Sequence, residues 1–148
     1  MINSNQKTHP KVSKHLVNNL QGLTSLRGIC KLYGCKVKTT DASTPTYWSH
    51  ESTIYLIKEQ INFNPIYSVR AFAHELAHHI QHQVLNKLNI SYDNTHFKDV
   101  LLFERTADRL GYFICKEHFP SFKLHHAHFK AYTSKAGIDM LREWHNNE

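Results

Sequence analysis

Residues 72–80 read FAHELAHHI and lie in the middle of the strongest helical pattern in the chain. Apolar side chains recur there at spacings of three and four residues from about residue 65 to residue 88. Pro65 stands where proline favours the first turn of a helix. Residues four apart in a helix are separated by about 40° around the axis and about 6 Å along it. We therefore expect His74 and His78 to project from one helix face.

His74, Glu75 and His78 form an HExxH motif, and its spacing suits a metal site. Both imidazoles can reach one zinc ion, while Glu75 lies beside the first ligand as the general base. Bound zinc lowers the pKa of water toward ~7, so a nearby carboxylate can accept its proton. Surface histidines on an ordinary helix are the alternative interpretation. Leu76 and Ala77 argue against it, since they predict a buried face, where these polar groups need a shared partner.

A catalytic zinc ion usually has a third protein ligand, and the next predicted helix offers one. We expect this ligand to be Glu104. Asp108 lies four residues later on the same face and can orient a ligand histidine through a hydrogen bond. His96 is the alternative third ligand and would complete a site with three histidines. Candidate side chains for stabilising a negatively charged oxygen during the reaction are Tyr92, His96 and Tyr112.

The chain of 148 residues is expected to form a single α+β domain. Its segments are a flexible start over 1–11, an N-terminal helix over 12–33, a core over 35–117 and C-terminal helices over 121–146. The helix that carries Glu104 and Asp108 is expected to run from about Thr95 to Glu117. The C-terminal helices are expected to separate near Gly137.

Three short segments rich in aromatic and β-branched residues predict a small sheet. They are residues 35–40, 46–49 and 52–57. Because their connections are short, we expect an antiparallel three-stranded sheet with the helices packed on one side. The motif helix would be the central helix of that core.

Composition limits where the protein acts and what it contacts. Eighteen Lys and Arg against twelve Asp and Glu give a formal net charge of +6, which favours acidic partners such as nucleic acid, although solvated lysines explain it equally. Three cysteines, an odd number without a secretory signal, indicate a reducing compartment. No apolar run is long enough to cross a membrane. We expect a cytoplasmic protein without membrane contact.

The HELAH sequence and the later Glu104-x-x-Ala-Asp108 resemble the gluzincin metallopeptidases. The short length, the small sheet and Arg70-Ala-Phe-Ala before the motif resemble the ImmA/IrrE family of metallo-endopeptidases, over about residues 35–117. The resemblance implies a zincin-type helical core and one Zn²⁺ held by two histidines and Glu104, with Asp108 supporting a ligand histidine. It also implies cleavage of a DNA-bound repressor in a phage or mobile element.

Two further resemblances leave other functions open. The SprT-type proteases use three histidines, and His96-Phe97 is similar to their third-ligand segment. The metallopeptidase domain of ArdC-type antirestriction proteins also carries an HELAH-like motif and a later glutamate. A zinc-containing antirestriction protein, or another nucleic-acid-associated protein that acts without proteolysis, is therefore the alternative to an endopeptidase.

Overall fold

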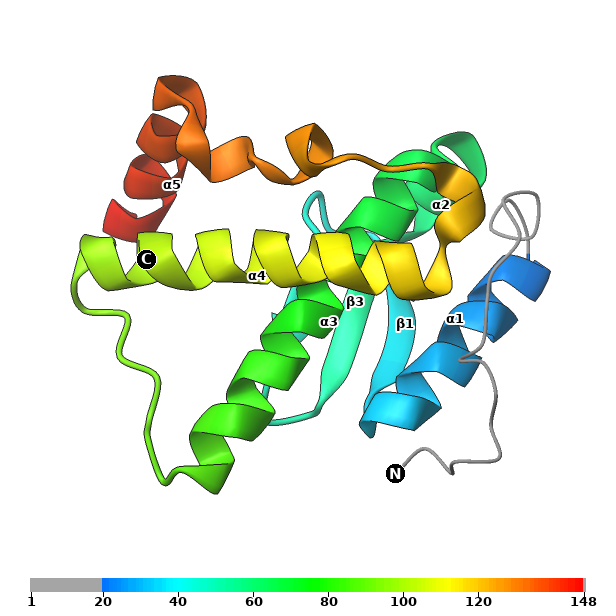
Figure 1. Cartoon of the computed structure of the whole chain (residues 1–148), viewed down its shortest axis with the longest axis horizontal. Coiled ribbons are helices and arrows are strands. Elements are labelled where there is room, and N and C mark those ends of the chain that lie inside the picture. Colours follow the sequence, from blue (N-terminus) through cyan, green and yellow to red (C-terminus); the bar gives the residue numbers. More distant parts are fainter. Residues whose placement is uncertain (1–19, 148) are drawn as a thin grey trace.

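The structure, a computed structural model, describes residues 20–147 and has an α+β fold (Figure 1). The five helices of this part are α1 (Leu20–Tyr33), α2 (Lys58–Phe63), α3 (Pro65–Lys87), α4 (Phe97–His118) and α5 (Lys135–Asn146). The strands are β1 (Lys36–Thr40), β2 (Thr46–Trp48) and β3 (Thr53–Ile57). The expected flexible start over 1–11 and the first part of the helix over 12–33 lie outside the described residues.

The three strands form a mixed sheet in the order β1-β3-β2. β3 is antiparallel to β2 but parallel to β1, so the prediction of an antiparallel sheet is wrong. That prediction assumed that strands adjacent in sequence also pair. Residues 41–52, which include β2, instead form the crossover that lets β3 run parallel to β1. β3 takes the central position, where Ile54 and Leu56 are buried beneath the helices.

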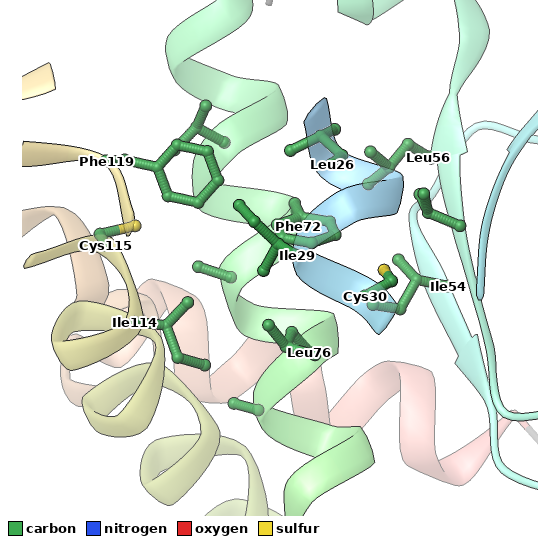
Figure 2. Close-up of a cluster of buried hydrophobic side chains, with 14 of the residues drawn as sticks. Leu26, Ile29, Cys30, Ile54, Leu56, Phe72, Leu76, Ile114, Cys115 and Phe119 are labelled. Carbon is green, nitrogen blue, oxygen red and sulfur yellow. The ribbon is translucent and has the colours of Figure 1, made fainter. Parts of the chain in front are cut away.

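α3 is the central helix, and it begins where the sequence predicts. The side chain of Asn64 accepts a hydrogen bond from the Tyr67 amide, and Pro65 follows this cap. Phe72 and Leu76 are fully buried between α1, the sheet and α4 (Figure 2). Burial of each such side chain stabilises the fold by about 1.5–3 kcal/mol. This packing fixes the rotation of α3 about its axis.

α4 lies across α3, and small side chains allow the close approach (Figure 1). Ala73 and Ala77 of α3 and Ala107 of α4 are fully buried. A Cβ atom on Gly111 would lie 3.4 Å from the backbone of Ala73, so the two helices nearly touch there. The crossing brings the middle of α4 over the HExxH turn of α3.

The segment after α4 is not the helix expected from residue 121. It forms three short 3₁₀ turns, η2 (Pro120–Phe122), η3 (His126–Phe129) and η4 (Ala131–Thr133). Lys123 adopts a left-handed conformation with φ of 52°, which ends the first turn. Tertiary contacts set this path, because Phe122 and Phe129 are both buried in the core. Gly137 does not separate two helices, since α5 runs through it.

Candidate metal centre

Side chains from α3 and α4 converge at the helix crossing. His74 Nε2 lies 3.0 Å from one carboxylate oxygen of Glu104, and His78 Nε2 lies 3.0 Å from the other. The two Nε2 atoms are 3.1 Å apart. One ligand atom from each of the three residues fits within 4.8 Å of the others, so this group can hold a metal ion.

The tautomer of His74 is set by Asp108. His74 Nδ1 lies 2.7 Å from Asp108 Oδ1, and an ionised carboxylate only accepts hydrogen bonds. Nδ1 therefore carries a hydrogen, and the neutral ring presents the lone pair of Nε2 toward Glu104. Asp108 comes from the turn of α4 that follows Glu104, so the spacing of four residues aligns both carboxylates with one imidazole.

The orientation of His78 is set by a neighbour on its own helix. Gln81 donates from Nε2 to the carbonyl of Phe103 at 3.0 Å, which turns its amide oxygen toward His78. That oxygen lies 2.8 Å from His78 Nδ1 and accepts the hydrogen there. The ring of Phe103 also stacks on His78, with the ring centroids 5.0 Å apart. His78 therefore presents the lone pair of its Nε2 as well.

Two imidazole lone pairs and a carboxylate meeting at one point need a cation between them. Without a metal, a proton takes this place. Burial lowers the pKa of His74, but hydrogen bonds with Asp108 and Glu104 hold that pKa well above its usual range. Burial raises the pKa of Glu104, but hydrogen bonds from both histidines hold it far below the usual range. The donor set therefore fits a divalent cation.

Glu75 lies beside this group but is not part of it. Its side chain is only 9% exposed, and no hydrogen bond reaches it from any residue in the range 20–147. Burial raises the pKa of Glu75, while the neighbouring His74 and His78 lower it. A buried carboxylate without a donor remains free to exchange a proton with water or a ligand.

Tyr132 also lies at this site, and sequence analysis missed it. Its ring centroid is 6.3 Å from that of His74, and burial and the charge of Glu104 raise the pKa of its phenol. The phenol therefore stays protonated and can donate a hydrogen bond. Arg105 holds the segment by donating from Nε to the Tyr132 carbonyl at 2.8 Å. Tyr132 belongs to no motif, and only the path of the 3₁₀ turns brings it near His74.

The other candidates from the sequence lie farther from the converging atoms. His96 caps the N-terminus of α4, which places it about 12 Å along the helix from Glu104. Tyr92 stacks on Phe103, with ring centroids 4.0 Å apart. Tyr112 stacks on His126 one turn beyond Asp108. The structure thus groups His74, His78, Glu104, Glu75 and Asp108, and it adds Tyr132.

Comparison with protein families, curated proteins and solved structures found no match to this chain. No helix within residues 20–147 is long and apolar enough to cross a membrane.

Proposed function

We propose that this protein is a zinc-dependent endopeptidase. The observation that carries the proposal is the convergence of His74 Nε2, His78 Nε2 and the Glu104 carboxylate beside the buried Glu75, which receives no hydrogen bond from residues 20–147. Two histidines and one glutamate are a common ligand set of catalytic zinc ions in proteins, and this set leaves a coordination position open. The resemblance to the gluzincins and to the ImmA/IrrE family supports the same assignment.

Each residue of the site has a distinct role in this proposal. Zinc, when bound, would polarise a carbonyl group and lower the pKa of water. Glu75 accepts a proton from the attacking water and returns it to the departing amine. The Tyr132 phenol donates a hydrogen bond to the carbonyl oxygen as negative charge develops there. Asp108 keeps the ring of His74 in one tautomer and orientation.

The proposed substrate is a protein, and a DNA-bound repressor of a phage or mobile element is the specific expectation. The net charge of +6 supports action near nucleic acid. The resemblance to the ImmA/IrrE family supports repressor cleavage in the cytoplasm.

Zinc analysis of purified variants tests the ligand set. His74→Ala, His78→Ala and Glu104→Ala should each lose the stoichiometric zinc, because each removes one of the three candidate ligands found within residues 20–147. The matched control His96→Ala should retain it. If His96→Ala lost its zinc and Glu104→Ala retained it, the third ligand would be His96 instead of Glu104.

Hydrolysis of a mixture of unstructured peptides, mapped by mass spectrometry, tests the reaction. The zinc-loaded protein should cut peptides, and Glu75→Gln should keep its zinc but lose at least a hundredfold in rate. Full biological activity in the Glu75→Gln variant would contradict proteolysis. That result would favour a nucleic-acid-associated or antirestriction protein that acts by binding.

A further inference from the structure

A small cavity lies between α4 and the 3₁₀ segment, next to the metal centre. Its volume is about 120 Å³, several times what one water molecule requires. Positive charge dominates its lining, which includes the side chains of Arg105, Arg109 and Lys130. The lining contains one carboxylate, that of Asp108. Asp108 Oδ1 accepts a hydrogen bond from His74, while its buried Oδ2 has no hydrogen-bond partner within residues 20–147.

Two of the cations are free to bind a ligand. Within residues 20–147, neither the Arg109 guanidinium nor the Lys130 ammonium has a carboxylate at ion-pair distance or a hydrogen-bond acceptor. Arg105 is different, because its Nε donates to the Tyr132 carbonyl. Arg105 therefore holds one wall in place, while Arg109 and Lys130 line the cavity as exposed residues without a protein partner in this range.

The cavity adjoins the candidate metal centre through two residues that line it. Asp108 and Tyr132 both line it, and both also contact or adjoin His74. An extended peptide advances about 3.3–3.6 Å per residue. The Tyr132 ring, which lines the cavity, has its centroid 6.3 Å from that of His74, which is about the length of two extended residues.

We propose that this cavity binds the carboxylate of an aspartate or glutamate in the substrate, close to the bond that is cleaved. The inference rests on the proposed peptidase function and adds its specificity. Arg109 and Lys130 are the recognising residues, and an arginine fork can hold both oxygens of a carboxylate. Arg109 and Lys130 are exposed, so their preference for a carboxylate over a neutral side chain comes from charge attraction and is strongest at low salt.

Peptide binding tests the cavity separately from hydrolysis. The probes are two alanine-based hexapeptides that differ only in carrying one central glutamate or one glutamine. Binding is measured by NMR titration to the zinc-loaded Glu75→Gln protein at low salt. We expect the glutamate peptide to bind about tenfold more tightly. Arg109→Gln and Lys130→Gln should each reduce this preference at least threefold, and the exposed matched control Arg27→Gln should leave it unchanged.

Three results would overturn the inference. The two peptides could bind equally, or the preference could survive both Arg109→Gln and Lys130→Gln. Inorganic phosphate or a single-stranded oligonucleotide could also outcompete the glutamate peptide at the Arg109-dependent site, which would assign the cavity to a phosphate group. If the unsubstituted zinc-loaded protein hydrolysed no peptide but still preferred the glutamate peptide, the peptidase function would be wrong. The carboxylate-binding site would still be supported.

Discussion

Glu75 is a buried carboxylate that receives no hydrogen bond among residues 20–147. Removing such a group from water is costly unless a partner replaces the lost hydrogen bonds. Burial raises its pKa, although the adjacent His74 and His78 act in the opposite direction. A general base works best with a pKa near the working pH, so this position suits proton transfer better than it suits stability.

Asp108→Ala should weaken zinc binding by about 10–100-fold, because the variant no longer orients His74 through its Nδ1 hydrogen. Competition with a coloured zinc chelator gives the affinity. Asp99→Ala is the matched control on the exposed side of the same helix. Equal affinities in the two variants would show that the contact between Asp108 and His74 does not affect the metal.

Tyr132→Phe should lower kcat by about a hundredfold and leave the zinc content unchanged, since it removes one hydrogen-bond donor but no ligand. Steady-state rates on a peptide from the cleavage mapping separate kcat from KM. Tyr55→Phe, whose phenol donates a hydrogen bond to Glu51, serves as the control. A change in KM alone would assign Tyr132 to substrate binding.

At the level of elements, the site depends on the crossing of α3 and α4 and on the segment that follows α4. The small residues Ala73, Ala107 and Gly111 let α4 approach until Glu104 reaches the two histidines. The 3₁₀ segment is held against α3 as well, because the Arg70 guanidinium donates to the carbonyl of His128. Two crossing helices thus position the three candidate ligands, and a nonhelical segment positions Tyr132.

Gly137→Ala should destabilise the protein, although alanine is normally the better helix former. A Cβ atom there would lie only 1.7 Å from the Ala131 carbonyl oxygen, so α5 would have to move away from η4. We expect a loss of about 1–3 kcal/mol in the free energy of unfolding, measured by urea denaturation. Gly28→Ala, which meets no atom within 4 Å, is the control and should stabilise α1 by up to about 1 kcal/mol.

At the level of the whole molecule, one core joins all the layers. Side chains of α1, β3, α3 and α4 meet in a continuous cluster (Figure 2). Cys30, Cys35 and Cys115 are free thiols buried in that cluster, as expected for packing residues. Burial raises the pKa of the Cys115 thiol to about 12, so it stays protonated and unreactive in the folded protein. The candidate metal centre is built on α3 and α4, which both contribute side chains to this core.

The metal-free protein should be most stable at weakly acidic pH. The pKa of Glu104 is lowered on folding, so its contribution is present above about 4.5 and is lost as the pH falls through the folded value. The pKa of His74 is raised, so its contribution is present below about 6.5 and is lost as the pH rises through its folded value. Glu104 and His74 therefore both contribute their full stabilisation between about pH 4.5 and pH 6.5.

Thermal unfolding across pH in the presence of a chelator measures this effect. Glu104→Gln should flatten the dependence on both sides of the optimum, because it removes the charge that both histidines face. Saturating zinc should move the optimum to higher pH, since ligand histidines bind metal only when neutral. An optimum of the metal-free protein above pH 7 would contradict the ion-pair geometry.

The amino-acid sequence by itself determined the elements whose spacing is local. The 3.6-residue period predicted α3 and most of α4, and the four-residue steps placed His74 with His78 and Glu104 with Asp108 on shared faces. Helix periodicity needs only neighbouring residues, so a single sequence contains it.

Tertiary structure alone decided the features that depend on contacts between distant residues. It placed β3 between β1 and β2, replaced an expected helix with 3₁₀ turns, brought Tyr132 near His74, and placed Lys130 with Arg109 in the lining of one cavity. These positions follow from which side chains the core can bury, and no local pattern encodes that choice. The physical reason is that burial is a property of the packed molecule, whereas helix spacing is a property of the chain.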